Sequence, residues 1–284
     1  MLRQRLILGP VMILVAFLVV WLDDLIEARI DRVGVAFGTL VAVAITMGCW
    51  ELARILRARD VLVVTPVALL AGLVGLLGTA FWINEPHALG TLAVLVMVLA
   101  LLVHIRHKTI QGVMAAAGGV MLVFVYLGVQ GSFWLTLRIE HSAWLVLWLV
   151  LVTKSCDIGA FFTGRALGKH KLIPWISPGK TWEGLVGGVT FSSLIAVAGY
   201  ALLAHAPGRP EIGYAWAAAM GAVMGGLGQL GDLTASLFKR DAGKKDSSNS
   251  IPGFGGWLDI LDSLLLVAPF AFWTLRGILA LQSH

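Results

Sequence analysis

The chain has 284 residues, of which 58% are hydrophobic and only 13% are charged. Soluble domains usually carry about 25% charged residues, so this composition excludes an ordinary soluble protein and predicts a polytopic membrane protein. The formal net charge of +5 does not indicate nucleic-acid binding, because topology alone places basic residues at membrane edges. The two cysteines, Cys49 and Cys156, lie in apolar surroundings and predict neither a disulfide framework nor a zinc site.

Apolar stretches of spanning length recur from the N-terminus to the C-terminus. The first has a basic start, but no small-residue cleavage site follows it, so we expect an uncleaved span. Helices are expected because backbone polar groups inside a bilayer must be satisfied within each segment. The predicted fold class is therefore an all-α, polytopic integral membrane protein of about nine transmembrane helices. The spans are expected near residues 6–22, 33–50, 61–83, 87–105, 110–130, 143–163, 184–205, 213–232 and 261–281.

The distribution of Lys and Arg residues predicts a cytoplasmic N-terminus. With that orientation, 15 of the 21 basic residues fall on the cytoplasmic side and five on the other, with Lys154 inside a span. The two longest polar breaks, 164–183 and 233–260, are then both cytoplasmic and can form one site. We therefore expect an N-terminal region of about five helices (1–140) and a catalytic region (141–284) that contains both loops.

Several acidic residues lie inside or at the ends of the expected spans. Asp157 lies within the sixth span, Asp232 ends the eighth, and Asp259 and Asp262 begin the ninth. Ionisable groups at membrane depth cost at least about 2.5 kcal/mol each, so each of these acids is a functional candidate. The alternative for Asp157 is an internal ion pair with Lys154, which lies three residues earlier on the same helix face.

Asp259 and Asp262 also share a helix face, where two carboxylates repel each other unless a positive charge lies beside them. A divalent cation meets this need, and magnesium prefers one or two carboxylates together with substrate phosphates. The alternative is that the acids only cap the last helix and favour its dipole. Because that alternative does not account for Asp232, we predict a metal site that uses some of these three acids.

Between the last two spans, basic residues alternate with acids and glycines. Lys239, Arg240, Lys244 and Lys245 suit the neutralisation of a polyphosphate or a lipid headgroup. The alternative is a basic patch that binds anionic lipids, but the interleaved acids argue against it. Gly253, Gly255 and Gly256 permit close approach of a ligand to the backbone, although the loop matches neither a dinucleotide fingerprint nor a P-loop.

The other polar loop precedes the expected seventh helix and is predicted to be irregular, because it contains Pro174, Pro178 and Gly179. Thr181 is placed to cap that helix, and a helix N-terminus beside Lys180 can hold an anion. The alternative is a capped basic loop without a ligand.

Together, the two loops resemble the phosphatidate cytidylyltransferase (CDP-diacylglycerol synthase) family. That family's signature reads S-x-x-K-R-x4-K-D-x-[GSA]-x2-[LIF]-[PGS]-x-H-G-G-x-x-D-R-x-D. The matching positions are Ser236, Lys239, Arg240, Lys245, Asp246, Ser248, Ile251, Pro252, Gly255, Gly256, Asp259 and Asp262. The stretches DIGAFFTGRALGKHKL and ISPGKTWEG also resemble family segments. Two positions depart from the signature, because Phe254 replaces a His and Ile260 replaces an Arg.

The resemblance implies a reaction in which CTP and phosphatidic acid give CDP-diacylglycerol and pyrophosphate. It implies Mg²⁺, with Asp232 and Asp259 as ligands and Asp262 and Asp246 in support, and it leaves a second cation open. Substrate phosphates would be held by basic and hydroxyl side chains and approached by the glycine loop. The expected catalytic residues are Asp259, Asp262, Lys239, Arg240 and Asp246. The expected substrate-binding residues are Ser236, Lys245, Gly255 and Gly256, with Asp157, Lys180 and Thr181 from the facing loop.

The implied location is a bacterial-type inner membrane, with the active site facing the cytoplasm and lipid entering from the bilayer. No nucleic-acid partner is expected, and a homodimer through glycine-rich spans stays open. A transferase that consumes CDP-lipids is disfavoured because its D-G-x2-A-R-x8-G-x3-D-x3-D pattern is absent. A transporter is disfavoured because the acids gather at one interface and no inverted repeat is visible. Phe254 and Ile260 keep a third alternative open, which is a divergent or inactive paralogue.

Overall fold

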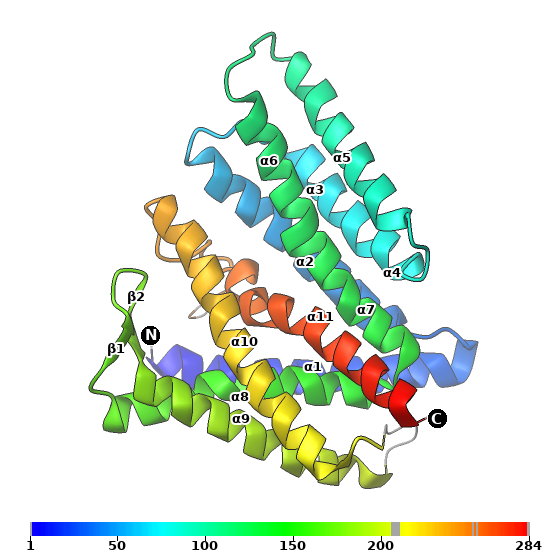
Figure 1. Cartoon of the computed structure of the whole chain (residues 1–284), viewed down its shortest axis with the longest axis vertical. Helices are drawn as coiled ribbons and strands as arrows, with labels where there is room; N and C mark the ends of the chain where they lie inside the picture. The colour runs from blue at the N-terminus through cyan, green and yellow to red at the C-terminus, as the bar shows by residue number, and fades with distance from the viewer. Residues whose placement is uncertain (1, 206–210, 252, 254, 283–284) are drawn as a thin grey trace. The chain divides into compact units, whose positions relative to one another are not determined.

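The computed structural model describes residues 2–205, 211–251, 253 and 255–282, and within them the fold is helical with one short hairpin (Figure 1). The π-helical segment η1 (Val74–Gly78) joins α3 to α4, η2 (Phe124–Val129) joins α6 to α7, and the short 3₁₀ helix η3 (Leu203–His205) follows α9. The α-helices are α1 (Leu2–Ile30), α2 (Val35–Arg57), α3 (Thr65–Leu73), α4 (Thr79–Phe81), α5 (Ala88–Ile105), α6 (Val113–Val123), α7 (Gln130–Glu140), α8 (Ala143–Leu167), α9 (Trp182–Leu202), α10 (Gly213–Asp241) and α11 (Trp257–Gln282).

Among the described residues, six helical segments are long and apolar enough to cross a membrane. They are Val35–Arg57, Ala88–Ile105, Val113–Glu140, Ala143–Leu167, Trp182–Leu202 and Trp257–Leu281. The expected all-α, multi-pass membrane protein is therefore confirmed. All nine expected spans overlap helices, but α1 and α10 are not among the six and Thr65–Phe81 is shorter, so the count of nine and the cytoplasmic N-terminus stay predictions.

The helix that contains the fifth expected span is longer than the sequence predicted. The sequence predicted an end near residue 130, whereas the helical segment Val113–Glu140 continues through η2 and α7. Ser132 Oγ donates to the Val129 carbonyl at 2.7 Å, and Thr136 Oγ1 donates to the Ser132 carbonyl at 3.1 Å. Since both hydroxyls bond to the helix's own backbone, these polar residues do not interrupt it.

The chain forms two compact units, and several helices contribute to both. The first unit comprises Ala36–Thr136 and Phe238–Leu261 with the start of α1. Its helices approach closely at glycines: a methyl group on Gly75 would lie 2.9 Å from the Phe124 carbonyl oxygen, and one on Gly128 would lie 2.6 Å from that of Gly72. These glycines therefore allow α3–η1 and η2 to approach closely, as small residues do between membrane helices.

The second unit comprises Met12–Val35, Leu137–Leu237 and α11 from Asp262 onward. Within it, α8 and α9 lie side by side along their length (Figure 1). Ser192 Oγ donates to the Val152 carbonyl at 2.8 Å, and Trp148 Nε1 donates to the Ala196 carbonyl at 3.1 Å. These bonds between α8 and α9 satisfy buried polar groups and hold the two helices in register.

A buried ion pair links α1 and α7 within the second unit. Arg138 is 2% exposed, its Nε donates to Asp23 at 2.5 Å, and its Nη2 pairs with Glu27. Nη1 also donates to the His141 carbonyl at 3.2 Å. Arg138 was one of the five basic residues that the sequence placed in non-cytoplasmic loops, but the structure shows it as a buried, paired charge.

The polar loop before α9 is an antiparallel hairpin, where the sequence predicted irregular structure. Strands β1 (Lys171–Ile173) and β2 (Ser177–Thr181) pair with Lys171 opposite Thr181. Thr181 then caps α9, because its hydroxyl accepts from the Gly184 amide at 3.1 Å. The predicted cap is confirmed, and Lys180 is held on a strand at the helix entrance.

Candidate active site

The signature segment starts with a well-defined end to α10. Gly243 has a φ of 67°, the left-handed conformation that glycine adopts at low cost. Its amide donates to the Arg240 carbonyl at 3.0 Å, and the Lys244 amide donates to the Lys239 carbonyl at 2.8 Å. This pair of bonds is a Schellman motif, which ends the helix directly after Lys239 and Arg240.

The glycine loop brings the chain back to the start of α11. Ile251 and Gly255 exchange both backbone hydrogen bonds, at 2.8 and 3.0 Å. Gly255 has a φ of 92°, which a residue with a side chain rarely adopts. The Gly-Gly pair of the signature therefore has a backbone role here. Pro252 and Phe254 lie outside the described residues.

Asp259 lies at the centre of a group of contacts at the start of α11. Its Oδ2 accepts from the Gly256 amide at 2.8 Å, from the Ser247 amide at 3.0 Å and from Ser247 Oγ at 2.8 Å. Its Oδ1 pairs with Lys239 Nζ. Asp259 thus has the capping role that the sequence left as an alternative, and the same carboxylate is also ion-paired to Lys239, a lysine of the signature that is nearly buried.

Glu51, on α2, completes this site and was missed by the sequence analysis. It is fully buried, and its carboxylate accepts hydrogen bonds from Ser247 Oγ at 2.7 Å and Ser248 Oγ at 2.6 Å. The first two amides of α11 also donate to it, Trp257 N at 3.1 Å and Leu258 N at 2.9 Å. A lone acid in an apolar span was an available signal, which the sequence analysis did not use. We call Glu51, Lys239, Ser247, Gly256 and Asp259 the cap cluster; it lies in the first unit.

A second polar group, in the second unit, joins three segments that are distant in sequence. Lys180 Nζ of β2 pairs with Asp232 Oδ2 of α10 at 2.6 Å. Gln229, one turn earlier on α10, donates from Nε2 to Asp157 Oδ1 of α8 at 2.7 Å. Asp157, Lys180, Gln229 and Asp232 form what we call the hairpin cluster. The structure therefore brings together three predicted site residues and adds Gln229, which the sequence analysis did not identify.

Lys154 and Asp262 both make hydrogen bonds to Ser263 of α11. Lys154 Nζ donates to Ser263 Oγ of α11 at 2.6 Å. Asp262 is 4% exposed, and its Oδ1 accepts from the Ser263 amide at 2.6 Å. Both hydrogen bonds lie within the second unit, so Ser263 connects the charged residues of α8 and α11 there.

The other predicted residues of the signature segment are more open to solvent. Arg240, Lys245 and Asp246 are exposed, and Ser236 is half-buried on α10. Arg240 Nη1 lies 3.4 Å from the Lys244 carbonyl. Ile260, the residue in place of the signature Arg, is half-buried on α11. The Arg240 and Lys245 side chains are thus exposed to solvent, whereas Lys239 is nearly buried and pairs with Asp259.

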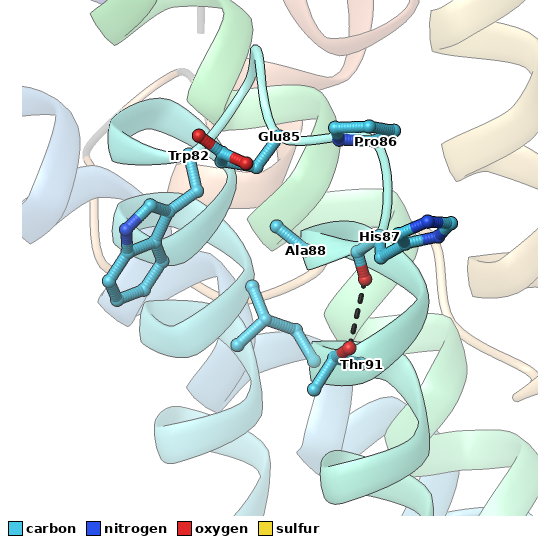
Figure 2. A pocket seen from close by; sticks show the side chains of 7 residues that line it. Trp82, Glu85, Pro86, His87, Ala88 and Thr91 are labelled. Atoms are coloured by element: carbon cyan, nitrogen blue, oxygen red, sulfur yellow. Dashed lines mark hydrogen bonds between the residues drawn. The ribbon is translucent and has the colours of Figure 1, made fainter.

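A pocket of about 500 Å³ lies elsewhere in the first unit, at the turn between α4 and α5. Figure 2 shows its lining, including the His87 carbonyl that accepts from Thr91 Oγ1 at 2.9 Å. The lining residues are Trp82, Glu85, Pro86, His87, Ala88, Thr91 and Leu92. Because this lining contains a carboxylate and no Lys or Arg, it is poorly suited to a phosphate ligand.

Another pocket, of about 350 Å³, lies between α8 and α9 in the second unit. Its lining is apolar except for the hydroxyls of Thr163 and Thr190, and Thr190 Oγ1 already donates to the Val186 carbonyl at 2.9 Å. This pocket offers apolar surface and no charge. Both pockets therefore lack the Lys or Arg side chains that a phosphate site needs, whereas both polar clusters contain a lysine.

Comparisons with known proteins agree with the family indicated by the signature segment. The family model described as "Cytidylyltransferase family" matches residues 3–278. A phosphatidate cytidylyltransferase of Haemophilus influenzae is 39% identical over 146 residues, which cover 48% of this chain and 49% of that protein. A phosphatidate cytidylyltransferase of Bacillus subtilis is 37% identical over 160 residues, which cover 56% of this chain and 58% of that protein.

A third relative, the uncharacterized protein YnbB of Escherichia coli, is 38% identical over 163 residues, covering 56% of this chain and 52% of that protein. The chain thus spans about half the length of the curated relatives it matches. The family model, in contrast, extends over nearly all of the chain and includes both polar clusters. The chain therefore belongs to the cytidylyltransferase family.

Proposed function

We propose that the protein transfers a cytidylyl group from CTP to phosphatidic acid and forms CDP-diacylglycerol and pyrophosphate. The observation that carries this proposal is the cap cluster, in which residues of the cytidylyltransferase signature gather around Asp259. The names of the two bacterial phosphatidate cytidylyltransferases support the same reaction.

In the proposed reaction, an oxygen of the lipid phosphate forms a bond to the α-phosphorus of CTP. The bond from that phosphorus to the oxygen that bridges to the β-phosphorus breaks, and pyrophosphate leaves with the electron pair. Such transfers depend mainly on positioning and on neutralising charge at the phosphates. Lys239 and Lys180 are the buried or half-buried cations proposed for this task, and Arg240 and Lys245 are the exposed ones.

We also propose a requirement for Mg²⁺, with Asp232 and Asp259 as candidate ligands and Asp246 and Asp262 in support. The donors are carboxylate oxygens, which Mg²⁺ prefers. Among the described residues, no group of three or more His, Cys, Asp or Glu side chains is placed to hold a metal ion. Magnesium commonly takes one or two carboxylates and completes its shell with water and substrate phosphates, so the proposal requires one or two of these acids as ligands. When bound, the ion would neutralise charge on the triphosphate.

The proposal includes a location and a direction of access. We place the protein in a bacterial inner membrane, with both polar loops on the cytoplasmic side, where CTP is dissolved. The excess of basic residues in these loops supports that orientation. Phosphatidic acid would enter from the bilayer. A homodimer through glycine-rich helices stays a prediction, which the mass of the protein in detergent would test.

The test measures both products of the reaction with purified full-length protein in detergent. CTP, phosphatidic acid and Mg²⁺ should give CDP-diacylglycerol and an equal amount of pyrophosphate, and removing the lipid or chelating the metal should abolish both. Asp259→Asn should remove the activity. Asp241→Asn is the matched control, since Asp241 is exposed, pairs with Arg59 at 3.2 Å and ends the same helix, α10.

A folded protein that makes neither product would overturn the proposal. Testing other lipid phosphates then separates the remaining alternatives. Turnover with one of these lipids would identify a divergent paralogue, as Phe254 and Ile260 first suggested. Absence of turnover with all of them would identify an inactive family member.

A further inference from the structure

Glu51 is a fully buried carboxylate on a helix that is apolar enough to span a membrane. A carboxylate in that setting is costly unless hydrogen bonds satisfy its oxygens. Five donor groups lie within hydrogen-bond distance of it: the hydroxyls of Ser247, Ser248 and Ser250 at 2.7, 2.6 and 3.5 Å, and the amides of Trp257 and Leu258 at 3.1 and 2.9 Å. Glu51 is therefore committed to one partner, the segment that these donors share.

That partner is the segment 247–258, which lies nearly 200 residues farther along the chain and inside the signature. Glu51 binds it at two places: the serine stretch at its start, and the first turn of α11 at its end. A side chain on α2 thus bonds to both ends of this loop.

Glu51 and Asp259 share one hydroxyl. Ser247 Oγ lies 2.7 Å from Glu51 Oε2 and 2.8 Å from Asp259 Oδ2, but it has one proton and can donate to one carboxylate at a time. If Asp259 turns to another partner, the hydroxyl can donate to Glu51 and stays satisfied. Glu51 is therefore the second acceptor that allows Asp259 to exchange its contacts without leaving Ser247 unpaired.

The contacts between Glu51 and the start of α11 require a glycine at position 256. A methyl group added there would overlap Ser247 Oγ and both carboxylate oxygens of Glu51. The second glycine of the Gly-Gly pair therefore permits the close approach of Glu51 to the start of α11, while Gly255 supplies the left-handed backbone.

We infer that Glu51 is a positioning residue for the transfer reaction: it holds the segment 247–258, and through Ser247 it orients Asp259. This inference rests on the proposed function. Without Glu51, the Asp259 carboxylate is still present but is no longer held in the same orientation. A misplacement of about 1 Å can cost on the order of 10²-fold in rate.

The test compares Glu51→Gln with the parent and with Asp23→Asn, a control that changes another fully buried carboxylate, ion-paired to Arg138 and outside both clusters. Gln keeps the shape of Glu but replaces one acceptor oxygen with a donor, so one of the two amides of α11 loses its partner. We expect kcat/KM for CTP to fall about 10²-fold in Glu51→Gln and to change less than about threefold in the folded fraction of Asp23→Asn.

Hydrogen exchange gives a readout that does not depend on turnover. In Glu51→Gln the amides of residues 247–258 should exchange roughly tenfold faster, while those of α5 keep their parent rates. If Glu51→Gln fails to fold, Ser248→Ala replaces it, since that change removes a single hydroxyl donor; the same region should exchange faster and kcat/KM should fall severalfold.

Unchanged exchange in 247–258, or unchanged kcat/KM in both variants of a working enzyme, would overturn the inference. A parent without transferase activity would overturn the proposed function instead. The exchange measurement still decides in that case whether Glu51 holds the segment, so the two failures are distinguishable.

Discussion

The cap cluster and the hairpin cluster hold their aspartates in different ways. In the cap cluster, Asp259 receives two backbone amides and a hydroxyl in addition to Lys239, and its side chain is 9% exposed. In the hairpin cluster, Asp232 pairs with Lys180, and the two side chains are 32% and 18% exposed. The first carboxylate is held by rigid backbone donors, and the second is paired with a flexible side chain closer to water.

This difference indicates which contacts a ligand can displace at low cost. The Lys180–Asp232 pair is more exposed to solvent than the Lys239–Asp259 pair, so solvent screens it more strongly and its two side chains separate at lower cost. Lys239 and Asp259 are nearly buried, and breaking such a pair by removing one partner costs about 3–5 kcal/mol. We therefore expect Lys180 and Asp232 to separate around a substrate at lower cost than Lys239 and Asp259.

We expect the largest effect from substitution of Asp259, where a double variant distinguishes loss of activity from loss of stability. Asp259→Asn should lower kcat/KM on the order of 10³-fold and destabilise the fold by about 3–5 kcal/mol, because Lys239 is left buried and unpaired. The double variant Lys239→Met/Asp259→Asn removes the buried charge as well. It should regain most of the stability, measured by thermal unfolding in detergent, but none of the activity. Recovery of activity in the double variant would contradict a chemical role for both residues.

The next prediction uses a buried ion pair outside both clusters. Arg138→Met leaves Asp23, which is fully buried, without its main partner. We expect a loss of about 3–5 kcal/mol in unfolding free energy, equal to that of Asp259→Asn, with kcat of the folded protein unchanged within about twofold. Thermal unfolding and turnover at low temperature measure the two quantities. A large drop in kcat would show that destabilisation alone explains the first result.

In the hairpin cluster, we expect a substitution to lower activity strongly and stability only slightly. Asp232→Asn should lower kcat/KM about 10²-fold, as expected for the loss of a charge that acts on phosphate or metal. It should cost less stability than Asp259→Asn, because the pair with Lys180 is more exposed to solvent than the pair of Lys239 with Asp259. Raising the salt concentration should shift the melting temperature of Asp232→Asn and of the parent equally. A loss above about 2 kcal/mol would place Asp232 with Asp259 among the structural carboxylates.

The sequence predicted the parts of this protein that depend on local pattern. Hydropathy predicted a multi-pass helical protein, and the Thr-Trp-Glu-Gly stretch predicted the cap of α9 by Thr181. The hairpin was missed, because its strands are only three and five residues long and the second contains Pro178 and Gly179, so neither shows a clear alternation.

Glu51 and Gln229 were missed for another reason. Their partners lie 196 and 72 residues away, at Ser247 and Asp157, and tertiary packing alone brings them together. The contacts of Asp259 were also only partly predictable from the sequence. Its spacing from Asp262 was visible in the sequence, but its pairing with the Gly256 and Ser247 amides depends on the path of the glycine loop.

The smallest expected effect tests whether the helix cap or the lysine beside it matters in the hairpin cluster. Thr181→Ala removes the hydroxyl that accepts from the Gly184 amide and should cost about 1 kcal/mol, whereas Thr181→Ser keeps the hydroxyl and should cost a few tenths. Because Lys180 is the preceding residue on β2, fraying at the cap should also loosen its contact with Asp232 and raise KM for CTP two- to threefold. If KM stays constant while stability falls, the cap supports the fold alone and Lys180 is positioned by β-pairing; if KM rises as much in Thr181→Ser, the methyl contact and not the hydroxyl is responsible.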